Sequence, residues 1–366
     1  MKERGTIIIM VMWLLAILSL FAVGLGYRSS IELRITSFYL DKIRCGYLGQ
    51  LAVYKVFSRI ANDQQDKVDT LNEYWSNSES DFKDAQYGNA KITVSHTADN
   101  NDEQKITLYG ASDECGKINI NTVPKAILES DYWKEHFAMD KDIVKAITHW
   151  RKKGRGGKDL NAWYRNTYGY KARHGAIPLI EELHFIKDFY DSSSEKNKRR
   201  AKLKDIITCY GKGTVNINTA SKEVLDALFV CQGDKKQFSD SDREEMVRLV
   251  IEYRNGEDGL PGTEDDNVFK NKNIETALET HESGKLSMLN WLRTKKVIDV
   301  ISDTFKIDAT VSIENKNMKR RVCAIVTRSK NIPKKNLTKK KQTKPLTLLA
   351  DPKKKDPMRI IKYFED

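Results

Sequence analysis

The stretch TIIIMVMWLLAILSLFAVGLGY, from Thr6 to Tyr27, carries no charged residue and is the only long apolar run in the chain. As a helix with a rise of 1.5 Å per residue, it is long enough to cross a hydrocarbon layer of about 30 Å. A helix buried in a soluble core would show a polar stripe, whereas this run shows only Ser19. Lys2 and Arg4 precede the run, so the short basic end is expected to stay in the cytoplasm. The sequence therefore predicts a single-pass membrane protein whose folded body lies outside the cytoplasm.

The rest of the chain has the composition of a soluble body. It has 366 residues, of which 40% are hydrophobic, and a mean hydropathy of −0.58. At about 100–200 residues per domain, this leaves room for two compact units beyond the anchor. A rough one-sided apolar spacing continues past the run, so we expect one helix from Thr6 to Ile60, about 80 Å long unless Gly24 and Gly26 bend it. A cleavable secretory signal, the competing interpretation, would have a shorter apolar core and no such continuation.

The net charge of +12 raises the question of a nucleic-acid partner. Much of the excess lies between Arg328 and Lys362, in lysine runs of a kind that are usually solvated loops or interaction tails. Contact with anionic lipid headgroups is the alternative outside the cytoplasm, where little nucleic acid is present. The five cysteines show no CxxC pair; a disulfide is permitted there, and Cys209 and Cys231 are the pair closest in sequence.

A short element occurs twice in the body. It reads ININTVPKAIL from Ile118 and VNINTASKEVL from Val215. Aligning Asn119 with Asn216 pairs identical Asn, Ile, Asn, Thr, Lys and Leu residues. Each copy begins as a short extended stretch with one buried face, and each is followed by a helix that ends in Ile-x-x-Trp-Arg or Ile-x-Tyr-Arg. The sequence predicts one helical unit used twice, with residues that shape turns and caps rather than catalyse: Asn119, Asn121, Thr122, Asn216, Asn218 and Thr219. Within this set, Thr122 and Thr219 are the candidate helix N-caps.

The repeated pattern resembles helix-hairpin-helix DNA-binding modules, which often begin with Asn-x-Asn-Thr-Ala and end in Ile-x-x-(Tyr/Trp)-Arg. Such modules use a glycine-rich hairpin whose backbone N–H groups contact phosphate, and neither copy has a Gly-Ile-Gly-like turn in its middle. The fold is therefore expected to be shared without the phosphate site. A membrane-anchored DNA-uptake protein remains the alternative function, and salt-sensitive DNA binding would distinguish it.

Strand-like segments flank the helical region. Residues 90–96 and 104–109 alternate before it, and residues 304–313, 320–327 and 358–363 follow it. Strands on both sides of a helical block predict an α+β fold. In that fold a long N-terminal helix packs on an antiparallel β-sheet, and a large all-helical domain is inserted into the sheet domain.

A tight acidic loop, from Asn255 to Asp266, is the candidate metal site. Five carboxylates on one glycine-rich loop repel one another without a cation, and hard oxygen ligands favour Ca²⁺. The spacing does not match an EF-hand, and a solvated acidic turn is the alternative. The candidate ligands are Glu257, Asp258, Glu264, Asp265 and Asp266. No arrangement typical of an enzyme is present: the six histidines form no HExxH or HxH, and there is no Gly-x-Ser-x-Gly elbow or glycine-rich phosphate loop.

The junction Lys2-Glu3-Arg4-Gly5-Thr6, placed directly before the apolar run, resembles a type IV prepilin signal. The resemblance implies that a prepilin peptidase cleaves between Gly5 and Thr6 and methylates Thr6, while the helix survives and packs into a filament. Most pilins and pseudopilins have a glutamate at mature position five, where this chain has Met10. A subunit without that glutamate suits the end of a filament better than its shaft. An ordinary signal anchor with a chance Arg-Gly pair is the alternative.

Together, the helix, the missing glutamate, the αβ body and the two Asn-x-Asn-Thr copies resemble the minor pseudopilin K family of the type II secretion system. The resemblance covers most of the chain from Arg4, and the lysine-rich stretch between Lys330 and Lys355 departs from it. It implies a tip complex with minor pseudopilins I and J, a structural role in exporting folded proteins across the outer membrane, and no nucleic-acid partner. It also implies calcium in the body, and a location in the inner membrane of a Gram-negative bacterium with the C-terminal domain in the periplasm.

These observations divide the chain into segments. Residues 1–5 are expected to be the prepilin leader, 6–27 the transmembrane part of the helix and 28–60 its extracytoplasmic part. Residues 61–115 and 302–366 are expected to form the pilin-like β domain, and 116–301 the inserted helical domain with its two helix-hairpin-helix-like repeats.

Overall fold

The computed structural model describes residues 3–63, 68–152, 158–190, 194–231, 239–270, 274, 278, 283–314, 316, 318–328 and 358–365. The lysine-rich stretch from Lys330 to Lys355 lies outside the described residues.

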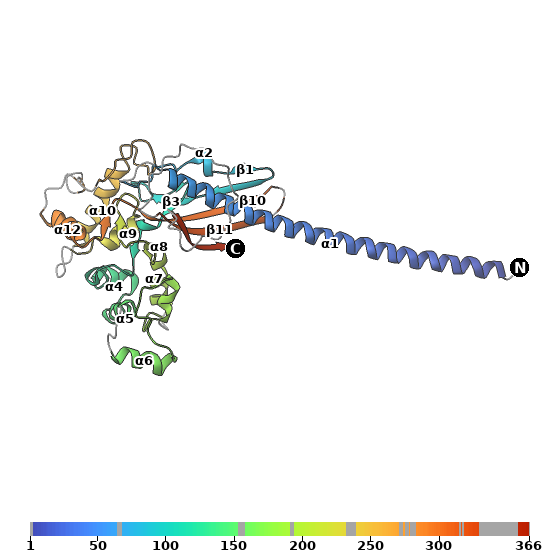
Figure 1. Ribbon diagram of the computed structural model, residues 1–366, viewed down its shortest axis with the longest axis horizontal. Coiled ribbons are helices and arrows are strands. Elements are labelled where there is room, and N and C mark those ends of the chain that lie inside the picture. Colours follow the sequence, from blue (N-terminus) through green and yellow to red (C-terminus); the bar gives the residue numbers. More distant parts are fainter. Residues whose placement is uncertain are drawn as a thin grey trace, which may run out of the picture.

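The N-terminal run is the first part of α1, a single helix from Glu3 to Asn62 that projects far beyond the body (Figure 1). Its 60 residues give a length of about 90 Å. Gly24 and Gly26 lie within the helix and do not interrupt it. The predicted continuous helix is therefore confirmed. Among the described residues, α1 is also the one helix long and apolar enough to cross a membrane.

The main sheet of the body is antiparallel, in the order β1–β2–β10–β11–β12, with the short β5 paired to β10 (Figure 1). In β10 the buried side chains alternate with half-buried ones, which is the pattern of a strand with one face on a core. This arrangement confirms the predicted α+β fold. The strands are β1 (Ala85–Tyr87), β2 (Ala90–Val94), β5 (Ser112–Asp113), β10 (Thr304–Ile313), β11 (Met318–Arg328) and β12 (Met358–Glu365).

The last third of α1 packs on this sheet. Cys45, Val53 and Val56 are fully buried there, among the inward side chains of β2, β10 and β11. At the closest approach, a Cβ added to Gly49 would overlap the side chain of Val322 on β11. Glycine at this position therefore sets how closely the helix lies on the sheet. A helical turn α2 (Glu79–Phe82) and a hairpin of β3 (His96–Asp99) and β4 (Lys105–Leu108) complete this part of the body.

The first Asn-x-Asn-Thr copy opens the first half of the insertion. This half begins at β6 and ends at β7, and these two strands pair in parallel. Between them, α4, α5 and α6 form an arm that extends away from the sheet (Figure 1). The elements are η1 (Glu114–Gly116), β6 (Ile118–Asn119), α3 (Lys125–Leu128), α4 (Asp131–Phe137), α5 (Lys141–Arg151), α6 (Lys158–Tyr168), η2 (Ile180–Phe185), α7 (Ser194–Ala201), α8 (Leu203–Ile206) and β7 (Ile207–Thr208).

The second copy opens an equivalent half. It begins at β8 and ends at β9, which again pair in parallel. Its elements are β8 (Val215–Asn216), α9 (Lys222–Leu228), α10 (Asp240–Arg254), α12 (Ser283–Thr294) and β9 (Ile298–Asp299).

The insertion is thus not all-helical, because each half is closed by a parallel pair of two-residue strands. The alternating Ile-Asn and Val-Asn residues that begin each copy explain why these positions are extended rather than helical. The insertion also has its own apolar core. One cluster of buried residues lies within the insertion, from Ile118 to Val300. A second cluster joins the end of α1 to the sheet domain, and its residues lie between Cys45 and Ala111 and between Phe305 and Val326.

Candidate functional site

The second asparagine of each copy binds a distant backbone segment in the same way. Asn121 donates to the Ile177 carbonyl at 2.9 Å and accepts from the Ile177 amide at 2.7 Å. Asn218 makes the same reciprocal pair with Phe269, at 3.0 and 2.9 Å. Because a side-chain amide offers one donor group and one acceptor, it satisfies both backbone groups of one residue. The identical geometry shows that the sequence repeat is also a structural repeat.

An arginine closes each copy from the end of its helix. Arg151, the last residue of α5, donates to the carbonyl oxygens of Ile120 and Val123 at 2.6 and 2.9 Å. Arg254, the last residue of α10, donates to Ala220, which aligns with Val123. The similar helix ends in the sequence therefore mark the residues that hold each Asn-x-Asn-Thr turn in place.

The two threonines are not the helix N-caps that we predicted. The helices begin later, after Pro124 and Ser221, and the Ser221 hydroxyl accepts from the Val224 amide. The asparagines shape the preceding turn, because Asn119 and Asn216 each accept the amide of the residue two positions on. This asparagine turn places Thr122 and Thr219 before the first helical turn, where their hydroxyls bind other segments.

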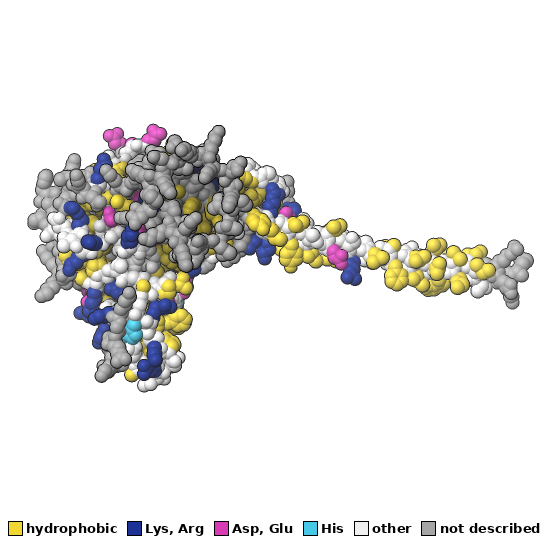
Figure 2. Space-filling model, in the orientation of Figure 1, with side chains coloured by type: hydrophobic (Ala, Val, Ile, Leu, Met, Phe, Trp, Pro, Cys, Tyr) yellow, Lys and Arg dark blue, Asp and Glu magenta, His cyan; other side chains and the backbone are white. Residues whose placement is uncertain are grey.

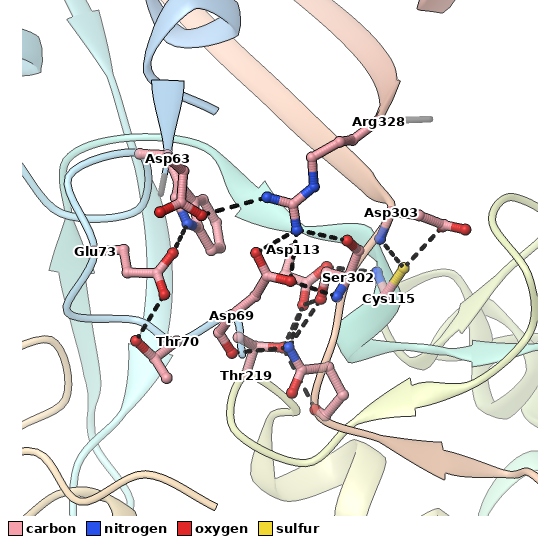
Figure 3. A network of polar contacts seen from close by, with 12 residues as sticks. Asp63, Asp69, Thr70, Glu73, Asp113, Cys115, Thr219, Ser302, Asp303 and Arg328 are labelled. Atoms are coloured by element: carbon pink, nitrogen blue, oxygen red, sulfur yellow. Dashed lines mark hydrogen bonds and ion pairs between the residues drawn. The ribbon is translucent and has the colours of Figure 1, made fainter. Parts of the chain in front are cut away.

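The first asparagine of the second copy leads into a buried polar network between the insertion and the sheet (Figure 3). The Asn216 amide donates to the Asp69 carbonyl at 3.0 Å, to the Ser302 hydroxyl at 2.8 Å and to Asp113 Oδ2 at 3.2 Å. Asp113, on β5, also accepts from the Ser302 and Thr219 hydroxyls and from the Cys115 amide. Burial raises the pKa of Asp113 to about 7. We call Asp69, Asp113, Asn216, Thr219 and Ser302 the junction network.

Arg328, at the end of β11, ties this network to the chain that follows α1. Its guanidinium contacts both carboxylate oxygens of Asp69, at 2.6 and 2.7 Å, and the Ser302 carbonyl at 2.9 Å. It also reaches Asp63 at 3.3 Å. Among the described residues, the only group of three or more potential metal ligands is Asp63, Asp69 and Glu73. Since Arg328 already provides a positive charge to two of these carboxylates, the group is an ion-pair cluster.

Glu73 is buried and lies on the side of this cluster away from Arg328 (Figure 3). Its carboxylate accepts from the Trp75 indole N–H, and the Thr70 hydroxyl lies 3.4 Å from its other oxygen. Burial, reinforced by the charge of Asp63, raises the pKa of Glu73 to about 8. A buried carboxyl with a raised pKa makes the stability of this region depend on pH.

The acidic loop closes on its own backbone. Asp265 Oδ2 accepts the amides of Glu257 and Asp258 at 2.8 and 3.0 Å, and Asp266 Oδ2 accepts the amide of Gly262 at 2.8 Å. The Thr263 hydroxyl holds the pKa of Asp265 below its usual range, whereas burial raises the pKa of Asp266 to about 6. Gly256 has a φ of +66°, and a Cβ there would overlap Asp265.

No three of the five loop carboxylates approach within 4.8 Å of one another in this fully described loop. Glu257, Asp258 and Glu264 are exposed, and the Thr263 hydroxyl links Asp265 to Asp266. The expected calcium site therefore stays a prediction. In the part of the chain that the structure describes, Cys209 and Cys231 form no disulfide with each other.

The outer face of α1 carries an apolar stripe on the side opposite the sheet. Leu40, Ile43 and Tyr47 are 62%, 55% and 68% exposed, and Leu51 and Tyr54 continue the stripe. Their spacing of three or four residues places them along one side of the helix. Figure 2 shows hydrophobic side chains exposed along much of the projecting part of α1, with a few charged side chains between them. An exposed stripe of this kind on a helix is typical of a surface that packs against another helix.

Comparison with solved structures finds a matching overall architecture. A chain of the crystal structure of the GspK-GspI-GspJ complex from the enterotoxigenic Escherichia coli type 2 secretion system aligns with a TM-score of 0.51. The alignment covers 90% of this chain and 99% of that chain, at 12% sequence identity. The fold is GspK-like. At this identity the similarity to GspK concerns the fold, and no protein-family model and no curated protein matches the sequence.

Sequence reasoning missed most of the junction network. Asp69, Asp113 and Ser302, and the Arg328 that contacts them, belong to no motif. Their position in the sequence could have indicated the network, because Asp113 and Ser302 lie at the two expected boundaries of the insertion. Buried polar groups at such a boundary must find partners across it.

Proposed function

We propose that this chain is a minor pseudopilin that takes the K position at the tip of a type II secretion pseudopilus. The observation that carries the proposal is the GspK-like arrangement of long helix, sheet and insertion over 90% of the chain. In this role the protein is a structural subunit that helps to export folded proteins across the outer membrane, and it has no catalytic activity.

The properties of α1 support the proposal. Its first part is exposed and apolar on all sides, as expected for a segment that contacts lipid or other membrane helices. We propose that this segment anchors the protein in the inner membrane and that the body lies in the periplasm. Met10 occupies the position where most pilins have a glutamate, which suits a subunit with no further subunit above it.

The apolar stripe of α1 provides the surface for partners. We propose that the stripe from Leu40 to Tyr54 packs against the helices of minor pseudopilins I and J, by analogy with the complex in which the similar fold was solved. Packing of apolar side chains between parallel helices buries the stripe, which in the isolated chain is exposed to water.

The first experiment is mass spectrometry of the N-terminus after co-expression with a prepilin peptidase. The expected product begins at methylated Thr6, cleaved after Gly5. A chain that still begins at Met1 would contradict the pseudopilin assignment and leave a signal-anchored protein. A gel shift with DNA at two salt concentrations then tests the alternative, because tight, salt-sensitive binding would support a DNA-uptake protein.

Co-purification with minor pseudopilins I and J tests the partner surface. The variants Ile43→Lys and Tyr47→Lys place a charge in the stripe and are expected to abolish co-purification. Lys42→Glu also changes the charge of an exposed residue of α1 and serves as the matched control, because it lies off the stripe. Equal recovery of partners by all three variants would mean that the stripe is not the interface.

Calcium binding at the acidic loop is a separate proposal. If Ca²⁺ binds there, the oxygens of Asp265 and Asp266 would hold it, and calcium would raise the melting temperature of the protein. The double variant Asp265→Asn, Asp266→Asn is expected to lose that increase. An unchanged melting temperature with and without calcium in the native chain would rule the site out.

A further inference from the structure

Two histidines come together in the first half of the insertion, at positions to which the sequence analysis gave no role. His149 lies near the end of α5, and His174 lies in the loop between α6 and η2. Their ring centres are 4.8 Å apart, and the ring planes are nearly perpendicular at 79°. His149 is only 8% exposed.

Each ring has one buried nitrogen with no hydrogen-bond partner among the described residues. These atoms are Nε2 of His149 and Nδ1 of His174. The other nitrogen of His174, Nε2, lies 3.0 Å from Asn161 Oδ1 and donates its hydrogen there, so that Nδ1 carries a free lone pair. The same asparagine side chain also lies close enough to His149 to influence its pKa. Buried nitrogens without partners are rare in native structures and are often explained by an ion or a water molecule.

The surrounding structure holds the two rings in place. The residues next to the histidines, Trp150 and Arg173, both donate to Glu182 Oε1, at 2.8 and 2.5 Å. The Gly175 amide donates to the Trp150 carbonyl at 3.1 Å, which fixes the loop to the end of α5. His174 adopts a φ of +52°, a conformation that costs energy for a residue other than glycine. The loop therefore keeps the His174 ring beside His149 at an energetic cost.

We propose that His149 and His174 form a binding site for a borderline divalent metal ion such as Zn²⁺. Two imidazoles that bind one tetrahedral zinc ion at about 2.0–2.1 Å have ring centres about 5 Å apart, close to the separation seen here. Asn161 would orient the rings as an outer hydrogen-bond partner, as is usual for histidine ligands. Water completes the coordination shell, because no carboxylate or thiolate of the described residues joins the two rings in a group of three.

The test measures zinc uptake by the full chain in detergent after treatment with a chelator. Equilibrium dialysis against Zn²⁺ is expected to show one bound ion for the native protein. Binding is expected to weaken at least tenfold in His149→Phe, which keeps a ring of similar shape, and in His174→Asn, because asparagine tolerates positive φ. His184→Asn changes an exposed histidine of the neighbouring η2 and is the matched control.

A spectroscopic readout separates loss of the site from loss of the fold. Zinc is expected to shift the NMR signals of the two histidine rings in the native chain while leaving those of His184 unchanged. The melting temperature of each metal-free variant is compared with that of the metal-free native protein. Zinc uptake is interpreted for the variants whose melting temperature agrees to within a few degrees. Absence of zinc uptake by the native chain, or equal uptake by native chain, variants and control, would overturn the proposal.

Discussion

The two Asn-x-Asn-Thr copies have the same local structure but different surroundings. In both, the second asparagine pairs with a distant backbone residue and a helix-terminal arginine closes the turn. The first asparagine differs. In the first copy, Asn119 donates to the Tyr210 carbonyl within the insertion, whereas in the second copy Asn216 donates to three groups at the junction with the sheet.

This difference separates two tasks that one sequence element performs. The first copy holds the insertion together, and the second copy also fastens it to the domain that packs on α1. A residue's sequence motif therefore determines its local hydrogen bonds, while its place in the fold determines how much stability depends on it.

The largest loss of stability is expected from removing Asp113, the acceptor at the centre of the junction network. Asp113→Ala leaves the donors of Ser302, Thr219, Asn216 and Cys115 without their common acceptor in a buried site. At about 1–3 kcal/mol for each unsatisfied buried group, the protein should lose about 4 kcal/mol of stability or fail to fold. Urea unfolding of the full chain in detergent, followed by tryptophan fluorescence, measures the loss. Asp102→Ala, at an exposed aspartate, is expected to change stability by less than about 0.5 kcal/mol.

The comparison of the two copies is tested most directly by one substitution in each. Asn216→Ala should cost about 3 kcal/mol, because it leaves Asp69, Asp113 and Ser302 short of a donor. Asn119→Ala removes a bond of 2.7 Å to the Tyr210 carbonyl and the same turn bond that Asn216 also makes, and should cost about 1 kcal/mol. Equal losses in the same unfolding assay would show that the junction does not depend on the second copy.

The carboxyl cluster beside the junction should make stability depend on pH. The pKa of Glu73 is raised from 4.5 to about 8, so the folded chain binds more protons than the unfolded chain between these values. Stability contributed by this group is therefore lost as pH rises from about 5 to 8. Glu73→Gln cannot titrate and should stabilise the protein at pH 8 by about 1–2 kcal/mol, with little effect at pH 5.

Melting temperatures at pH 5 and pH 8 measure this effect. Glu79→Gln, at an exposed glutamate of α2, is the control and should follow the native protein at both values. If Glu73→Gln kept the pH dependence of the native chain, the cause would lie in another group.

The smallest difference in lost stability is expected between substitutions of the second asparagine in the two copies. Asn121→Ala and Asn218→Ala each remove a reciprocal pair with one backbone residue and should each cost about 2 kcal/mol. Their values should agree within about 0.5 kcal/mol, in contrast to the first asparagines. A much larger loss for Asn218→Ala in urea unfolding would mean that the whole second copy, and not Asn216 alone, carries the junction.

Sequence patterns predicted the parts of this fold that depend on periodicity. The uncharged run from Thr6 and the spacing that follows it predicted a continuous α1. Alternation predicted β2, β4 and β10, and a strand-like segment predicted β11. The repeat predicted two equivalent halves of the insertion. Its helix starts were placed too early, because the asparagine side chains form a turn that delays the helix to Lys125 and Lys222.

The junction network and the histidine pair could not be predicted in this way. Asp69 and Ser302 are 233 residues apart, and Asp113 and Asn216 are 103 apart. Contacts across such distances depend on how the insertion is placed on the sheet. His149 and His174 likewise meet because the loop after α6 returns to the end of α5, which no local pattern encodes.

Because α1 is one continuous helix, its length also sets how the body is rotated about the helix axis. Cys45 is the first residue of the helix that is buried on the body, and the segment between it and Tyr27 has exposed or half-buried side chains. An α-helix turns by about 100° for each residue, so one residue inserted into this segment would rotate the body by about a quarter turn relative to the membrane segment while moving it only 1.5 Å outward. The number of residues in this segment therefore fixes the direction, around the axis of α1 and relative to the membrane segment, in which the arm of α4, α5 and α6 points.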